Sequence, residues 1–303
     1  MKPISKLHEK LLSGEFAVTG ECGPPRGANK AVIDTKAKLL NGHVTAVNVT
    51  DNQTAIVRMS SIAASTHLVN AGLEPVMQMV VRDRNRIAIQ SDIMGAYSLG
   101  IRNILCLSGD HQCFGSQPDA RNVFDIDSVN LIRTVRDMRD IGKDMSGFDL
   151  DVAPKMFIGA AANPFADPFE YRVLRLGKKI DAGADFIQTQ CIYNMDRFKE
   201  WIRRANEEGL TENVYILGGV TPMRTAGMAR YMNNKVAGMD VPESLIKRMD
   251  GVDKKDQAKE GIKICLETIE ELKSMKGVHG IHIMAIEWEE VVGRIVEQAG
   301  LNK

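Results

Sequence analysis

The stretch Arg102-Asn-Ile-Leu-Cys-Leu-Ser-Gly-Asp110 decides the fold class. Its apolar, β-prone centre predicts a strand, and Ser108 and Gly109 then end the strand and place the carboxylate of Asp110 just beyond it. A helical pattern precedes the stretch, and a long polar loop, 111–127, follows it. In α/β proteins, ligands bind at the carboxyl ends of parallel strands. Asp110 is therefore either a site residue or a turn former, and the local pattern alone favours the turn.

Seven similar strand patterns accompany this one, and they alternate with helical patterns. We predict strands within 16–19, 43–50, 75–81, 102–110, 156–162, 185–192, 214–220 and 278–286. The first four recur roughly every thirty residues, as a β/α barrel requires. Eight units, without a Gly-x-Gly-x-x-Gly after the first strand, favour a closed (β/α)8 TIM barrel over a doubly wound open sheet. The pattern adds a helix within 1–15 and two further helices within 242–275, before the last strand.

Helix-capping residues support several of these units. Asp127-Ser128 predicts a helix start, and Asp83 is a candidate cap for the helix after the third strand. The clearest start is Asp167-Pro168-Phe169-Glu170, which combines an N-cap Asp, Pro at the first helical position and Glu three residues after the cap. Thr221-Pro222 is expected to cap the helix after the seventh strand.

Composition limits the class of protein. The chain has 303 residues, 44% of them hydrophobic and 26% charged, with a formal net charge of zero. We expect one barrel domain over 1–303, in the cytoplasm, with no field that attracts nucleic acid or a membrane surface. Residues 1–15 lack the apolar core of a signal peptide, and no apolar run is long enough to span a bilayer. Five scattered cysteines without a Cys-x-x-Cys argue against a disulfide framework, a zinc site or an iron–sulfur cluster within the chain.

The predicted strand ends supply a set of polar residues at the barrel mouth. They are Glu21, Thr50, Asp83, Asp110, Asn163, Gln190 and Glu287. The six histidines show no metal-ligand spacing, and no Ser/His/Asp or Cys/His set stands out, so we predict no metal and no nucleophile. Acids and amides suit a polar heterocyclic ligand, and they weakly favour proton or hydride chemistry on an organic cofactor.

Each candidate has an ordinary explanation beside the functional one. Glu21 is equally well explained as a proton donor in an apolar mouth, where a carboxyl keeps its proton more readily, or as a solvated loop acid. Helix capping accounts for Asp167, although a helix N-terminus also attracts anions. Lys178 and Lys179 suit the C-terminal end of a helix dipole. Gln190 is harder to explain without a ligand, because a buried amide needs partners.

Several motifs in a fixed order resemble those of the methylenetetrahydrofolate reductase family of flavin-dependent barrels, from about Phe16 to Leu301. The motifs are Gly20-Glu21-x-x-Pro24-Pro25-Arg26, Asn48-Val-Thr50, Arg82-Asp83-Arg-Asn-Arg86, Gly100-Ile-Arg-Asn-Ile104 with Gly109-Asp110, Ala162-Asn163-Pro164, Asp181-Ala-Gly-Ala184 and Gln188-Thr-Gln190. The resemblance implies reduction of 5,10-methylenetetrahydrofolate to 5-methyltetrahydrofolate by hydride from reduced flavin. It implies that Glu21 is the general acid, that Asp110 contacts the pterin near the flavin, and that Gln190 binds folate.

The resemblance also implies a flavin site, with FAD expected rather than FMN. The matching positions are Thr50, Gln78, Ser108, Gly109, Asp110, Phe124, Ala161, Asn163, Asp167, Arg175, Lys178 and Lys179. Four positions depart from the family pattern. Gln78 stands in place of a histidine, Phe124 of a tyrosine, Arg172 of an aspartate and Trp288 of an arginine.

These departures resemble a branch found in anaerobes that make methyl groups from one-carbon units, as in the Wood–Ljungdahl pathway, rather than in methionine biosynthesis alone. The resemblance implies an electron donor that is either NAD(P)H or a partner subunit with iron–sulfur or zinc centres, and thus an oligomer or hetero-complex. Two alternatives remain open: a non-redox pterin-binding barrel that takes part in methyl transfer with a partner protein, and a flavin-free scaffold subunit.

Overall fold

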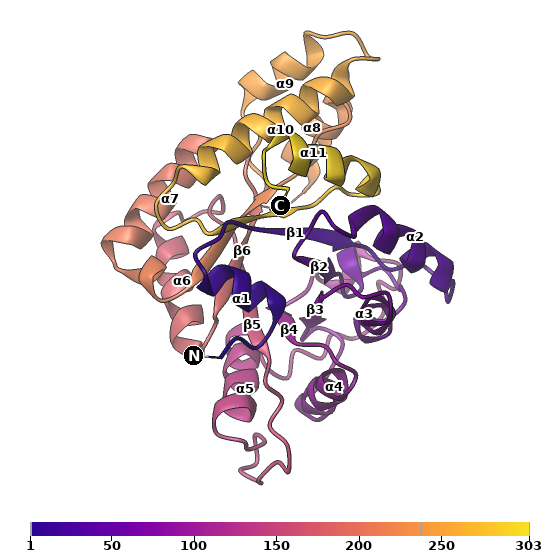
Figure 1. The fold of residues 1–303 in the computed structure, drawn as a ribbon, viewed down its shortest axis with the longest axis vertical. Coiled ribbons are helices and arrows are strands. Elements are labelled where there is room, and N and C mark those ends of the chain that lie inside the picture. The colour runs from indigo at the N-terminus through magenta and orange to yellow at the C-terminus, as the bar shows by residue number, and fades with distance from the viewer. Residues whose placement is uncertain (1, 237, 303) are drawn as a thin grey trace.

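The structure, a computed structural model that describes residues 2–236 and 238–302, contains a closed barrel of eight parallel strands paired in sequence order (Figure 1). β8 pairs with β1 and completes the closure. The strands are β1 (Ala17–Cys22), β2 (Ala46–Val49), β3 (Pro75–Val80), β4 (Asn103–Leu107), β5 (Phe157–Ala162), β6 (Phe186–Cys191), β7 (Tyr215–Val220) and β8 (Gly280–Ile283). The predicted (β/α)8 fold is confirmed.

Helices surround the barrel and alternate with its strands. They are α1 (Lys6–Leu12), α2 (Lys30–Leu40), α3 (Ser61–Asn70), α4 (Arg86–Ser98), α5 (Ser128–Asp140), α6 (Glu170–Ala182), α7 (Met195–Glu207), α8 (Ala226–Lys235), α9 (Glu243–Asp250), α10 (Gln257–Lys273) and α11 (Val292–Gln298). The N-terminal helix and the two extra helices before β8 occur where the sequence predicts them. Figure 1 shows α9 extending away from the barrel. None of the helices in the described ranges is long and apolar enough to cross a membrane.

Some predicted boundaries are wrong. The first strand continues through Cys22 rather than ending at Thr19, because Glu21 pairs in register with Asn48 of β2. Glu21 therefore projects from a strand and not from a loop. The sequence pattern also predicts a final helix over 287–298, but this helical segment begins at Glu289 with a 3-10 turn, because the φ of 57° at Glu287 is incompatible with a right-handed helix.

The predicted cap at Asp127 is confirmed, because its carboxylate accepts a hydrogen bond from the backbone N–H of Asn130 at 2.7 Å. The predicted start at Asp167 is wrong. The helix begins at Glu170, and the Asp167 carboxylate pairs with Arg197 of α7 instead. The ion pair with Arg197 therefore engages the carboxylate that the local sequence spacing predicts as a helix cap.

Two further cap predictions are also wrong. Thr221 is buried with its hydroxyl 2.9 Å from the Cys191 thiol, and Thr225 caps the helix in its place. Asp83 binds the neighbouring Arg82 guanidinium, and Asn85 supplies the cap of α4. In both cases a polar partner close in space changes which residue caps the helix.

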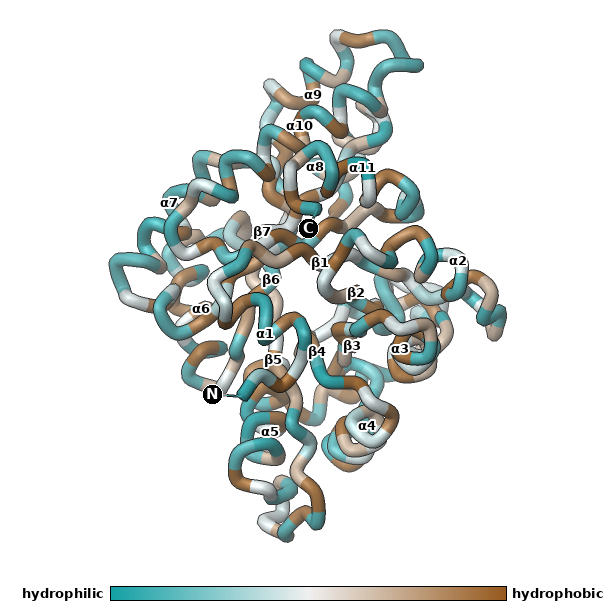
Figure 2. The backbone as a smooth tube through the Cα atoms, in the orientation of Figure 1, coloured by the Kyte–Doolittle hydropathy of each residue, from teal (hydrophilic) through white to brown (hydrophobic). Residues whose placement is uncertain are grey.

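The inside of the barrel is divided between an apolar and a polar half. At the amino ends of the strands, side chains such as Phe157 and Phe186 stack 5.0 Å apart, and α1 closes this end with the buried Leu7 and Leu11. Between the strands and the surrounding helices lies a second, continuous apolar core. Figure 2 shows hydrophobic segments along the strands and hydrophilic ones on the outer helices. Apolar packing thus anchors one end, which leaves the carboxyl ends of the strands for polar residues.

Gly159 of β5 marks the tightest packing inside the barrel. A Cβ at this position would lie 2.3 Å from Cζ of Phe186 and 2.8 Å from Cδ1 of Leu105, and both side chains are buried. We expect Gly159→Val to lower the free energy of unfolding by about 1–3 kcal/mol through overpacking. Gly95→Ala in α4 is the control, because nothing lies within 4 Å of its added Cβ. Urea unfolding should show the control slightly stabilised, by about 0.5–1 kcal/mol. Equal stability of the two variants would contradict the packing described for β5.

Candidate functional site

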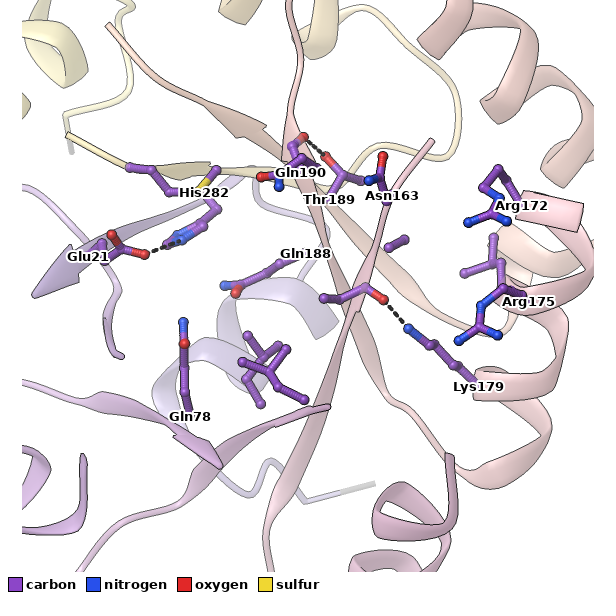
Figure 3. Close-up of a pocket in the computed structure, with 16 residues that line it drawn as sticks. Glu21, Gln78, Asn163, Arg172, Arg175, Lys179, Gln188, Thr189, Gln190 and His282 are labelled. Carbon is purple, nitrogen blue, oxygen red and sulfur yellow. Dashed lines mark hydrogen bonds and ion pairs between the residues drawn. The ribbon is translucent and has the colours of Figure 1, made fainter. Parts of the chain in front are cut away.

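A cavity of about 460 Å³ lies at the carboxyl ends of the strands (Figure 3). Six strands and α6 contribute to it. Its lining consists of Glu21, Gln78, Leu105, Leu107, Ala161, Ala162, Asn163, Arg172, Arg175, Leu176, Lys179, Gln188, Thr189, Gln190, His282 and Met284. The apolar members come mainly from β4 and β5, and the polar ones surround them. The cavity is large enough for one organic ring system with charged groups at its edge.

The structure brings half of the predicted site residues together in this cavity. These are Glu21, Gln78, Ala161, Asn163, Arg175, Lys179 and Gln190. Gln78 comes from β3 and Gln190 from β6, so they line the same cavity only because the strands close into a barrel. Asn163 also accepts a hydrogen bond from the backbone N–H of Phe165 at 2.9 Å, which fixes the loop after β5.

Asp110 lies outside the cavity lining, exposed beyond the end of β4. Its carboxylate accepts a hydrogen bond from the backbone N–H of Thr54 at 3.1 Å, and Arg82 donates to its carbonyl at 2.9 Å. The residue therefore fastens the loop after β4 to the loop after β2. The contact between Asp110 and a ligand therefore stays a prediction, and the observed role is that of a loop anchor.

The remaining predicted cofactor positions are not part of the cavity lining. Ser108 and the backbone of Gly109 lie at the end of β4, and Thr50 lies buried at the end of β2. Phe124, Asp167 and Lys178 are exposed.

One wall of the cavity is cationic. Arg172, Arg175 and Lys179 follow one face of α6 at steps of three and four residues and line the cavity together (Figure 3). Lys179 donates a hydrogen bond to the carbonyl of Ala161. Its burial, and then its proximity to Arg175, lower its pKa to about 8. Because a desolvated lysine next to two arginines is unfavourable on its own, this wall is suited to an anionic group.

The opposite wall carries the acid. In Figure 3, Glu21 and His282 lie across the cavity from the three cations. Oε2 of Glu21 is 3.8 Å from Nε2 of His282, and the imidazole is almost completely buried. Gln190 lies nearby on β6, and its side-chain oxygen accepts from the backbone N–H of Cys191 at 3.1 Å. The Gln190 amide N–H groups are then the part of the side chain suited to a ligand acceptor.

A polar layer forms the floor beneath Glu21. It consists of Thr19, Asn48, Gln188 and His282, each buried and each on a different strand. The sequence prediction missed this layer. Gln188 and Gln190 are two positions apart, and so are Thr19 and Glu21, a spacing that puts strand side chains on the same face. That period of two, applied to the named site residues, would have identified Gln188 and Thr19.

Metal-ligand groups and the buried thiols are the alternatives to an acid and amide site. No group of three or more His, Cys, Asp or Glu side chains within 2–236 and 238–302 could hold a metal ion. Burial raises the pKa of Cys22, Cys191 and Cys265 to about 12 in each case, so these thiols stay protonated.

The sequence matches a known family model. Residues 6–300 match the model described as methylenetetrahydrofolate reductase. A probable methylenetetrahydrofolate reductase (NADPH) of Caenorhabditis elegans is 24% identical over 83% of this chain. A 5,10-methylenetetrahydrofolate reductase of Pectobacterium carotovorum is 25% identical over 76% of this chain and 71% of its own length. The chain spans about a third of the first curated relatives it matches, 36% of the worm protein and 34% of a fission yeast relative.

The fold also has a solved counterpart. A structure described as an uncharacterized protein from Clostridium thermocellum that binds two copies of 5-methyl-5,6,7,8-tetrahydrofolic acid superimposes with a TM-score of 0.65. It covers 99% of this chain and 98% of its own, at 16% sequence identity. A 2,3-dimethylmalate lyase superimposes with a TM-score of 0.51 at 11% identity. At these identities the superpositions show the shared barrel fold.

Proposed function

The chain belongs to the methylenetetrahydrofolate reductase family, and we propose that it reduces 5,10-methylenetetrahydrofolate to 5-methyltetrahydrofolate with a bound flavin. The observation that carries the proposal is the two-sided cavity. A carboxyl on β1 faces the cations of α6 across the cavity, whose lining also includes the apolar side chains of Leu105 and Leu107. A pterin and a flavin both present polar edges around a flat apolar ring, and the cavity offers the matching surfaces.

The residues present fit a flavin. Arg175 and Lys179 suit its phosphate groups, and a bound anion would offset the cost of the buried Lys179 charge. The Thr50 hydroxyl is buried and has no hydrogen-bond partner among the described residues. Gly109 has a φ of 86°, and a Cβ there would lie 3.0 Å from Cβ of Val80, so the turn after β4 requires glycine at this position. FAD is proposed rather than FMN.

The proposed roles follow from position. When bound, reduced flavin supplies the hydride that converts the methylene carbon to a methyl group. Glu21 supplies the proton to the ring nitrogen that leaves that carbon, because it is the one carboxyl among the described lining residues. Gln190 orients the pterin through its amide. Asp110 holds the loop at the mouth and borders the ligand from the end of β4.

Absorption spectroscopy tests the proposal. Purified protein is expected to be yellow, and anaerobic 5-methyltetrahydrofolate is expected to bleach the flavin band, because the reverse reaction transfers hydride to oxidised flavin. A colourless protein that binds folate but takes up no added flavin would instead support the non-redox methyl-transfer barrel. A protein that binds neither would support a scaffold subunit.

We also propose that electrons reach the flavin either from NAD(P)H or from a partner subunit with iron–sulfur or zinc centres. The support is Gln78, which lines the cavity where family members have a histidine, together with the absence of clustered cysteines in the sequence. Mixing the purified chain with NADH or NADPH under anaerobic conditions decides between them. Rapid bleaching by either nucleotide would remove the need for a partner.

A further inference from the structure

The hydrogen bonds within the polar layer beneath Glu21 run in one direction, from donor to acceptor, around the barrel. The amide nitrogen of Asn48 donates to Oε1 of Gln188 at 2.9 Å, and the amide nitrogen of Gln188 donates to the hydroxyl of Thr19 at 3.3 Å. The Thr19 hydroxyl proton has two acceptors within reach, Nδ1 of His282 at 3.0 Å and the carbonyl of Ile281 at 3.4 Å, and the shorter contact favours Nδ1. The chain of donors thus runs around the barrel interior and ends at the imidazole.

The imidazole tautomer follows from that direction. The Asn48 amide nitrogen lies 2.9 Å from Nδ1 and 3.1 Å from Nε2 of His282, so Asn48 does not select between the two ring nitrogens, and the Thr19 hydroxyl decides which one accepts. A nitrogen that accepts cannot carry the proton of a neutral imidazole, which then resides on Nε2. Second-layer hydrogen bonds select the tautomer of metal-bound histidines in the same way.

Nε2 in turn faces the carboxyl. It lies 3.8 Å from Oε2 of Glu21, with both side chains largely shielded from water. Such contacts are often long in ligand-free sites and shorten in the substrate complex. A carboxylic acid has one accepting and one donating oxygen. When Nε2–H occupies Oε2, the acidic proton is left on Oε1.

We propose that His282 is a positioning residue for Glu21, fixed as the Nε2–H tautomer by the Thr19 hydroxyl. It directs the acid proton of Glu21 into the cavity, an inference that rests on the proposed function. In the step, the O–H bond of Glu21 breaks and an N–H bond to the substrate forms. The electron pair stays on the carboxylate, which Nε2–H stabilises, and His282 itself loses no proton.

Two substitutions of His282 distinguish the effect of losing its N–H donor from the effect of losing its ring packing. His282→Gln keeps an N–H close to the Nε2 position, whereas His282→Phe keeps the ring and loses the donor. We expect His282→Phe to slow flavin bleaching by 5-methyltetrahydrofolate about 10- to 100-fold, and His282→Gln to restore most of the rate. Photoreduction of the flavin should be unchanged in both. His279→Phe is the matched control, because His279 lies at the other end of the same strand, where it accepts from the backbone N–H of Ile216 at 3.2 Å.

A second measurement needs no folate. In protein with ¹⁵N-labelled histidine, the signals absent from His282→Gln identify His282. In the wild type these signals are expected to show a protonated Nε2. Thr19→Val is expected to give a mixture of the two tautomers, and Glu21→Gln is expected to change the Nε2 signal. A protonated Nδ1, or an Nε2 signal indifferent to Glu21→Gln, overturns the inference. So do equal bleaching rates in wild type and His282→Phe. Wild-type flavin that folate fails to bleach refutes the proposed function, and the ¹⁵N signals then still decide the role of His282.

Discussion

Glu21→Gln is expected to slow folate-dependent turnover by about 100- to 10,000-fold while the flavin stays bound and reducible. The amide has the size of the carboxyl but cannot give up a proton to a leaving nitrogen. Glu21 and the cations of α6 lie on opposite walls of the cavity, so the substitution leaves the proposed flavin contacts in place. Stopped-flow bleaching by 5-methyltetrahydrofolate and photoreduction of the bound flavin measure the two properties separately.

Glu290→Gln is the control for that experiment, because this exposed glutamate lies in the 3-10 turn after β8 and outside the cavity lining. It should behave as wild type in both measurements. If Glu21→Gln releases the flavin, Glu21 supports the cavity structure and is not its acid. If folate turnover persists at the wild-type rate, another group delivers the proton.

The barrel could be predicted because each strand and helix is encoded locally. Apolar runs with Gly and Pro breaks were enough to place all eight strands, and the thirty-residue spacing of the first four supported the barrel. Two of the three failed cap predictions concern a residue whose partner lies far along the chain. Asp167 has every local feature of a cap, yet Arg197 takes its carboxylate. Thr221 is likewise drawn to Cys191 of the neighbouring strand.

The site residues also divide into those that the local sequence identifies and those that only the fold identifies. Family motifs led to Glu21 and Gln190, which the barrel brings into one cavity. The histidine beneath Glu21 had no motif of its own, because its meaning depends on Thr19, 263 positions away. A lone histidine in an apolar strand indicates core or site equally well until the closure of β8 on β1 is known. Asp110 is the reverse case: its motif is clear, and the structure shows an additional role in joining two loops.

Lys179 affects both the stability of the folded protein and the proposed binding of an anion. Its pKa of about 8 lies below the ordinary value of 10.5, because burial and Arg175 disfavour the charge. The unfolded chain therefore binds more protons between pH 8 and 10.5, so the lysine destabilises the ligand-free protein below about pH 8 and ceases to do so as pH rises through that window. Two and a half pKa units correspond to about 3 kcal/mol. An anion bound at this wall removes the penalty, which couples ligand binding to stability.

Lys179→Met is therefore expected to raise the unfolding free energy of the flavin-free protein at pH 7 by about 1–3 kcal/mol, less the hydrogen bond to Ala161. The same change should weaken flavin binding about 10- to 100-fold, because a charge-assisted contact to phosphate is lost. Urea unfolding and flavin titration measure the two effects, and the stability gain should vanish above about pH 10.5. Lys178→Met, exposed on the same helix, is the control for stability and should change it by less than about 0.5 kcal/mol. A destabilised Lys179→Met protein at pH 7 would mean that neighbouring groups already stabilise the Lys179 charge in the ligand-free protein. The cationic wall would then gain no stability from a bound anion at Lys179.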